Sequence, residues 1–171
     1  MTDSAAKRRG TESERESMQL RERIQADTKE AMKARDSARL SVLRLISAAI
    51  KDREIAARSE NAEHAGLSDA DLIAILSKMV KQRHESTRAY EEGGRLELAR
   101  KEEAEIAVIQ GYLPRQLDEA EIRAAIDDAV ARLGASSVRD MGRVMGELRG
   151  RYAGQMDFGA VGPIIKERLM G

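Results

Sequence analysis

The residues best suited to chemistry in this sequence are positively charged side chains on helix-forming segments. Lys78 and Lys81 are three residues apart, so a helix places both ammonium groups on one exposed side. Arg44 and Lys51 are seven residues apart and share a helical face in the same way. If the two helices are neighbours, these cations form one basic strip that suits nucleic-acid phosphates. The alternative is a solvated face on which pairs such as Lys81 and Glu85 neutralise each other.

The C-terminal segment adds a weaker signal of the same kind. Residues 134–171 carry six basic groups against four acidic groups, an excess of two positive charges. Arg143 and Lys166 are the candidate phosphate-binding residues in this segment.

Glycines at regular spacing form a second type of candidate site. Gly142, Gly146, Gly150 and Gly154 follow one another at intervals of four residues, so one helical face lacks side chains. Another backbone can approach such a face closely. Gly142 and Gly146 therefore indicate either packing within the chain or a docking surface for RNA or protein.

Residue types that catalysis or metal binding requires are sparse. The chain has no cysteine, and we interpret its two histidines, His64 and His84, as surface residues instead of metal ligands. Four glutamates lie close together in the sequence: Glu97, Glu102, Glu103 and Glu105. Because they lie among Arg100 and Lys101, we expect a solvated helix flank instead of an acid–base pair. With no nucleophile elbow or nucleotide-binding glycine loop either, the sequence predicts no catalytic residue, no metal and no cofactor.

The elements that position these side chains are expected to be helices. Hydrophobic residues make up 42% of the 171 residues and charged residues 35%, whereas aromatic residues make up 2%. Strong helix formers dominate, two prolines leave long stretches uninterrupted, and no strand pattern competes. The predicted fold class is all-α. Because the net charge is zero, nucleic-acid binding would require a local basic patch.

Neither the start of the sequence nor its interior predicts export or membrane insertion. Residues 1–17 are polar, with no large apolar side chain between Met1 and Met18, so we predict a disordered extension and no signal peptide. No stretch approaches the roughly 18 apolar residues that a membrane span requires. The expected location is the cytoplasm.

Helical periodicity divides the remaining residues into two predicted modules. The first module, residues 18–113, is expected to contain four helices at about 18–35, 36–56, 69–92 and 96–113, with a loop at 57–67. The third helix is the clearest, because Ser68 and Asp71 match a capping box and the pair Gly93-Gly94 is expected to end it. Leu98 is expected to face inward on the fourth helix.

The second module, residues 114–171, begins at Pro114 and is expected to contain three helices. Their predicted caps are Asp118, Ser136 or Ser137, and Asp157. Gly134 is suited to end the first of them, and Val138 is expected to face inward on the second. In the last helix, Pro163 either introduces a kink or marks the true start.

Four segments together resemble the GatB/YqeY family. They are LSVLRLISAAIKDREI (40–55), LIAILSKMVKQRHES (72–86), YEEGGRLELARKEEAEIAVIQGYLPRQL (90–117) and MGRVMGELR (141–149). The resemblance covers about residues 20–170. In length and module order, the chain is similar to the stand-alone YqeY-like members. It implies two helical modules like those in the tail of the GatB subunit.

GatB belongs to a glutamine-dependent amidotransferase that converts mischarged tRNA, and its tail helps to hold the tRNA. The resemblance therefore implies an association with tRNA or with a tRNA-amidotransferase complex, a carbon–nitrogen ligase that uses glutamine as amido-N donor. In that enzyme, the kinase-like chemistry lies in a separate cradle domain and the glutaminase lies in a partner subunit. This chain resembles neither of these two catalytic parts.

Three hypotheses about function remain. The first is a non-catalytic tRNA-binding or amidotransferase-associated protein. The second is a protein-docking module that makes no contact with nucleic acid. The third, an enzyme that acts alone on an amide, is the least favoured because no nucleophile, metal or nucleotide motif is present.

Overall fold

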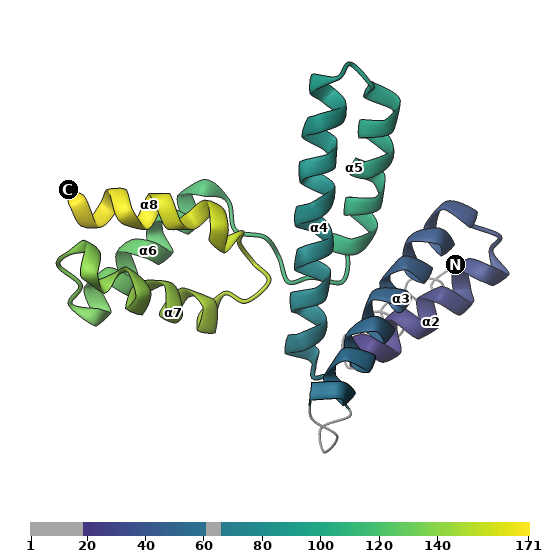
Figure 1. Ribbon diagram of the computed structural model, residues 1–171, viewed down its shortest axis with the longest axis horizontal. Helices are drawn as coiled ribbons and strands as arrows, with labels where there is room; N and C mark the ends of the chain where they lie inside the picture. The colour runs from purple at the N-terminus through teal and green to yellow at the C-terminus, as the bar shows by residue number, and fades with distance from the viewer. Residues whose placement is uncertain (1–18, 61–65) are drawn as a thin grey trace, which may run out of the picture.

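The computed structural model describes residues 19–60 and 66–171, and all regular structure in these ranges is helical (Figure 1). The predicted all-α fold is confirmed. The elements are α2 (Leu20–Lys33), α3 (Ser37–Glu60), α4 (Asp69–Glu92), α5 (Leu96–Gln110), α6 (Glu119–Leu133), η1 (Val138–Asp140), α7 (Met141–Arg151) and α8 (Phe158–Met170). The predictions for residues 1–17 and for His64 lie outside the described residues.

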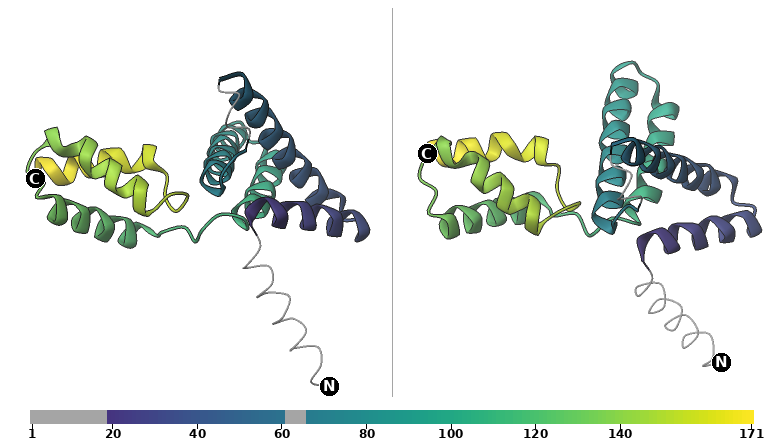
Figure 2. Two further views of the ribbon diagram at one scale, coloured as in Figure 1. Left: turned by 90° about the horizontal axis from the view of Figure 1, so that it is seen from below. Right: turned by 60° about the horizontal axis from the view of Figure 1, so that its bottom comes forward.

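The helices form three arms. The α4–α5 hairpin stands upright in Figure 1, the α2–α3 pair extends to one side of it, and α6, α7 and α8 form a bundle on the other side. The two further views show the same separation of the bundle from the remaining helices (Figure 2). A short linker, residues 111–118, joins α5 to α6.

Local signals at the helix ends act as the sequence predicts. Ser68 and Asp71 form a capping box at the start of α4, and the hairpin to α5 turns at Gly94, whose φ is +71°. The Asp118 side chain accepts a hydrogen bond from the backbone N–H of Glu121, and Gly134 ends α6 with a φ of +61°. Because glycine lacks a Cβ, it adopts these left-handed conformations without steric cost.

Several details of the sequence prediction are wrong. Helix α3 continues through residues 57–60, which were predicted to be a loop. Leu98 is 38% exposed, although it was predicted to face inward. Ala99 lies on the buried face of α5 with Ile106 and Ile109, and adjacent residues of a helix point in different directions. Val138 is 41% exposed because it begins the separate 3₁₀ turn η1, which precedes α7.

Helix α8 resolves the two alternatives for Pro163. The helix begins at Phe158 and contains Pro163, so the alternative start at Pro163 is wrong. Asp157 caps the helix, and its carboxylate accepts a hydrogen bond from the Gly159 N–H over 3.0 Å. The carbonyl that loses its helical donor to Pro163 belongs to Gly159, which is exposed and can be solvated.

Two hydrophobic clusters lie on either side of the linker. The first joins α2, α3, α4 and α5 around fully buried residues such as Leu43, Ile46 and Leu76. The second joins α6, α7 and α8 around residues such as Val144 and Ile165. The domain boundary at residues 113 and 114 remains a prediction, because separate clusters do not by themselves establish separately folding units.

A buried polar contact fixes the end of α5 against α2. The Tyr112 hydroxyl donates a hydrogen bond to Asp27 Oδ2 over 2.6 Å, and these two residues are 85 positions apart. Both are buried, at 6% and 8% exposure. Arg39 of α3 lies 3.6 Å from the same carboxylate oxygen, so three elements meet at Asp27.

Within residues 19–60 and 66–171, none of the helices is both long enough and apolar enough to cross a membrane.

Candidate nucleic-acid interface

A hollow of about 320 Å³ lies where α4 meets the beginning of α8. Its walls come from five parts of the chain: α4, the end of α5, the linker, the turn between α7 and α8, and the start of α8. The lining residues are Ser77, Lys78, Val80, Lys81, His84, Gln110, Leu113, Gln116, Gly154, Met156, Asp157, Phe158 and Gly159. The hollow therefore combines residues from both halves of the sequence.

The α4 wall carries the positive charge. Lys78, Lys81 and His84 are spaced three residues apart, so successive turns present them on the same side of the helix. All three are exposed. Neither lysine forms an ion pair with any residue that the structure describes. The neutralising Lys81–Glu85 pair, which was the alternative interpretation, is not formed in this part of the chain.

The opposite wall is the N-terminal end of α8. Lys81 Nζ lies 3.3 Å from the position that a Cβ on Gly159 would occupy, so the absence of a side chain there leaves room for the ammonium group. A helix N-terminus carries partial positive charge from its free N–H groups. One carboxylate, Asp157, also lines the hollow and accepts the Gly159 N–H. Two ammonium groups and a helix N-terminus thus share the site with one negative charge.

Gly154 holds the two halves together around this hollow. Its φ is +74°, and a Cβ at this position would lie 2.5 Å from Ile73 Cγ2 and 3.3 Å from Pro114 Cδ. Only glycine fits here, because a side chain would be both strained and in collision with α4. The Gln116 side chain donates a hydrogen bond to the Gly154 carbonyl over 2.5 Å, and the Leu117 N–H donates to the Gln155 carbonyl over 2.9 Å.

Phe158 brings an aromatic ring and a further cation to the rim. The Arg149 guanidinium lies over the Phe158 ring at 5.8 Å from its centroid. Such cation–π contacts hold an arginine in place without removing its charge. Arg149 forms no ion pair with the described residues, so it places a positive charge beside Phe158, which lines the hollow.

The structure separates the other candidate cations from this hollow. Arg44 lines a different groove, between α3 and α5. Lys51 is exposed further along α3 and lines neither hollow. Lys78 and Lys81 therefore lie beside α8. The predicted basic strip, which would join these two lysines to Arg44 and Lys51, does not line either hollow.

Of the two candidate cations in the C-terminal bundle, Arg143 already forms hydrogen bonds within the chain and Lys166 forms no ion pair with the described residues. Arg143 donates to Asp140 Oδ1 over 2.9 Å and to the Leu133 carbonyl over 2.7 Å, so its guanidinium closes the end of α6. Lys166 is exposed on α8 and forms no ion pair in the described part of the chain.

Glycines 142 and 146 do not pack against another element. A Cβ at Gly142, Gly146 or Gly150 would meet nothing within 4 Å among the described residues, so this face of α7 is open. Gly154 does not share the face, because α7 ends at Arg151. The open face of α7 therefore includes three of the four regularly spaced glycines.

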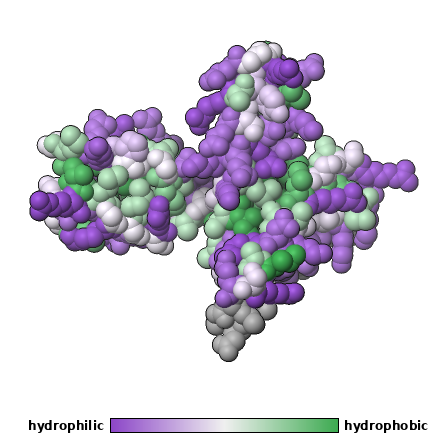
Figure 3. All heavy atoms as spheres, in the orientation of Figure 1, coloured by the Kyte–Doolittle hydropathy of each residue, from purple (hydrophilic) through white to green (hydrophobic). Residues whose placement is uncertain are grey.

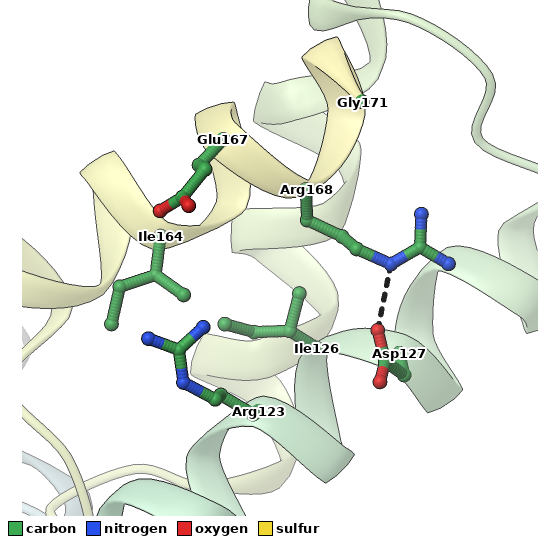
Figure 4. Close-up of a pocket in the computed structure, with 7 residues that line it drawn as sticks. All are labelled: Arg123, Ile126, Asp127, Ile164, Glu167, Arg168 and Gly171. Atoms are coloured by element: carbon green, nitrogen blue, oxygen red, sulfur yellow. Dashed lines mark hydrogen bonds and ion pairs between the residues drawn. The ribbon is translucent and has the colours of Figure 1, made fainter.

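A second hollow, of about 370 Å³, lies within the C-terminal bundle between α6 and α8 (Figure 4). Its charged groups are partly used already, since the Arg168 side chain points to Asp127 and donates a hydrogen bond to it over 2.7 Å. Arg123 is likewise paired with Glu119. This hollow offers less free positive charge than the one beside α4.

Sequence reasoning missed most of the α8 wall. Gly154, Gly159 and Phe158 contact or face α4 from about 75 to 80 residues further along the chain, and no local pattern reports such proximity. His84 was interpreted as a surface histidine; it is exposed, but it lines the hollow. The glycine-rich sequence after α7 was the only available signal, because two glycines close to a helix cap indicate a tight turn.

Relatives of the chain are fungal proteins with one shared name, "Altered inheritance of mitochondria protein 41, mitochondrial". The protein of Eremothecium gossypii is 37% identical over 90 residues, which cover 53% of this chain and 46% of the relative. That of Lachancea thermotolerans is 31% identical over 116 residues, covering 67% and 59%. That of Pyrenophora tritici-repentis is 32% identical over 135 residues, covering 75% and 71%. The chain thus spans about half to three fifths of the length of the first two.

These names contradict the predicted location. The location predicted from the sequence is the cytoplasm, whereas the relatives are named as mitochondrial proteins. The cytoplasmic prediction is therefore wrong. It relied on the lack of an apolar signal segment, but mitochondrial targeting segments are amphipathic, so this criterion does not separate the cytosol from mitochondria.

The family itself is shown by a match to almost the whole described chain. Residues 21–169 match the family described as Yqey-like protein, and the match includes every α-helix from α2 to α8 except for residues at its two ends. The match also includes the four segments on which the resemblance was based, and both hydrophobic clusters lie almost entirely within it. The chain belongs to the YqeY-like family.

Proposed function

We propose that this chain is a non-catalytic RNA-binding protein whose ligand is tRNA, alone or in an amidotransferase-related complex. The observation that carries the proposal is the hollow between α4 and α8, where Lys78 and Lys81 have no ion-pair partner in the described residues. The resemblance to the tRNA-holding tail of GatB supplies the identity of the RNA.

Local charge explains how a neutral protein would bind a polyanion. The chain has 30 basic and 30 acidic residues, so long-range attraction is weak. Many arginines form salt bridges within the chain, such as Arg83 with Glu105 at 2.9 Å and Arg115 with Glu121 at 2.6 Å. The unpaired lysines beside α8 are therefore available to phosphates, and the adjacent helix N-terminus distinguishes them from the other unpaired cations of the surface.

The test is an electrophoretic mobility shift titration of bulk tRNA at several salt concentrations. We expect binding by the wild-type chain to weaken steeply with salt, because phosphate contacts release counterions. The double variant Lys78→Glu/Lys81→Glu should bind at least about tenfold more weakly, with a log–log salt slope reduced by about two.

The matched control is Lys29→Glu/Lys33→Glu. Both lysines are exposed on α2, remote in sequence from the hollow, and the double change alters the net charge equally. We expect this control to retain most of the wild-type affinity. Equal losses in the two double variants would show that bulk charge and not this hollow determines binding, and undetectable wild-type binding would remove the proposal altogether.

A further inference from the structure

The second notable surface is a groove of about 760 Å³ between α3 and α5. One wall is formed by Ala38, Ser41, Val42 and Leu45, and the other by Lys101, Ala104, Glu105 and Val108. Each set follows the spacing i, i+3, i+4, i+7, so each is one continuous face of its helix. In Figure 3, apolar surface gathers in the notch between the α4–α5 hairpin and the α2–α3 pair.

The α3 wall presents apolar side chains to solvent, since Leu45 is 46% exposed. Leu98, one turn before Lys101 on α5, is 38% exposed and lies outside the groove lining. Ala38 and Ser41 on the α3 wall and Ala104 on the α5 wall allow a close approach of a third backbone, as small residues do at helix interfaces. Each wall extends over eight residues, whose seven steps of 1.5 Å span about 10 Å, which matches two turns of a guest helix.

The charges at the rim determine what kind of helix fits. Two of the charged side chains are already paired: Glu105 with Arg83 at 2.9 Å, and Arg39 with Asp27 at 3.6 Å. Arg44 on the α3 wall and Lys101 on the α5 wall have no ion-pair partner in the described residues. Asp36 also lines the groove; its carboxylate accepts the Arg39 backbone N–H over 3.2 Å and has no ion pair in the described residues. The unpaired charges of the lining are therefore two cations, one on each wall, against one carboxylate, an excess of one positive charge.

We propose that the α3–α5 groove binds an amphipathic helix of a partner protein that has an apolar stripe flanked by acidic residues. Helices dock into grooves through apolar residues at this same spacing, and acidic flanks would pair with Arg44 and Lys101. Residues 1–17 of the chain itself do not supply this helix, because they contain no large apolar side chain after Met1. This docking activity goes beyond the proposed RNA binding and does not rest on it.

The probe is a pair of fluorescein-labelled 18-residue helical peptides. One carries a leucine–alanine stripe flanked by glutamates, and the other is identical except that every glutamate is lysine. Fluorescence anisotropy with the full chain at near-physiological salt should show at least about tenfold tighter binding of the acidic peptide.

Three variants locate the binding site. Leu45→Glu should weaken binding of the acidic peptide at least about tenfold, because it places a negative charge on the apolar α3 wall. Arg44→Glu/Lys101→Glu should reverse the preference in favour of the lysine peptide. Lys51→Glu, an exposed position on the same helix that does not line the groove, is the control and should bind like the wild type. Far-UV circular dichroism confirms that each variant is folded.

The outcomes separate the possible occupants. Equal affinity for both peptides, or binding that Leu45→Glu leaves unchanged, would overturn the proposal. Sedimentation velocity of the chain alone tests a second copy: a dimer that Leu45→Glu dissociates would make the groove a self-association surface, which also overturns it. Leu45→Glu should still bind tRNA, and Lys78→Glu/Lys81→Glu should still bind the acidic peptide, so the failure of one proposal is distinguishable from the failure of the other.

Discussion

The contact between Tyr112 and Asp27 gives the sharpest test of how the N-terminal helices are held together. The change Tyr112→Phe removes the hydroxyl that donates to Asp27 over 2.6 Å and preserves the ring. Arg23 contacts that ring by a cation–π interaction at 5.6 Å, so the substitution leaves this packing in place. The variant therefore isolates one buried hydrogen bond.

The expected cost at neutral pH follows from burial and charge. Both residues are less than 10% exposed, and a hydrogen bond to a charged group contributes about 1.5–3 kcal/mol. Arg39 remains 3.6 Å from the carboxylate and compensates in part. We therefore expect Tyr112→Phe to lower the free energy of unfolding by about 1.5–3 kcal/mol.

The same contact predicts a dependence on alkaline pH. Burial, together with the bond to Asp27, raises the pKa of Tyr112 from 10.0 to about 12. Since the folded state holds this proton more tightly than the unfolded state, the stabilisation is fully present below pH 10 and is lost as the pH rises through 12. The stability gap between wild type and Tyr112→Phe should therefore narrow over this interval, by up to about 3 kcal/mol for a shift of this size.

The assay is urea unfolding followed by far-UV circular dichroism at pH 7 and at intervals between pH 9 and pH 12. Tyr90→Phe is the matched control, because the Tyr90 hydroxyl makes no hydrogen bond with the described residues. A loss below about 0.5 kcal/mol at pH 7, or a gap that stays constant from pH 9 to pH 12, would refute the reasoning.

Three glycine-related substitutions give further predictions, each measured as the free energy of unfolding in urea. Gly154→Ala should destabilise by about 2–5 kcal/mol, because φ is +74° and the new Cβ would lie 2.5 Å from Ile73 Cγ2; a loss below about 1 kcal/mol would show that the turn relaxes easily. Gly146→Ala is its counterpart in the interior of α7, where a Cβ meets nothing within 4 Å, and should stabilise by about 0.5–1 kcal/mol. Arg35→Gly should stabilise by about 0.5–1 kcal/mol, since Arg35 has a φ of +55° after the end of α2; no gain would indicate that the arginine side chain offsets its backbone strain.

Most of the helices could be predicted from the sequence because their signals are local. The capping box at Ser68, the turn at Gly94 and the left-handed end at Gly134 depend on residues a few positions apart, and all three are confirmed. The errors occur where local patterns compete. Val138 belongs to a short 3₁₀ turn instead of α7, and helical propensity carries α3 through residues 57–60.

The candidate site was predictable only in part. Spacing placed Lys78 and Lys81 on one face of α4, as the structure has them. That the face meets Gly159 and Gly154 of the C-terminal bundle was not predictable, because the contact depends on the path of the linker. For the same reason, Arg44 and Lys101 became a pair of rim charges only after α3 and α5 were placed side by side.

The sequence alone determined the all-helical fold, the caps and turns, the zero net charge and the absence of familiar catalytic motifs, since composition and short-range spacing decide these properties. The tertiary structure alone decided which cations remain unpaired, which glycine is obligatory and where two amphipathic faces enclose a groove. The physical reason is that pairing, collision and enclosure depend on residues distant in the chain, such as Asp27 and Tyr112, whose proximity no local pattern encodes.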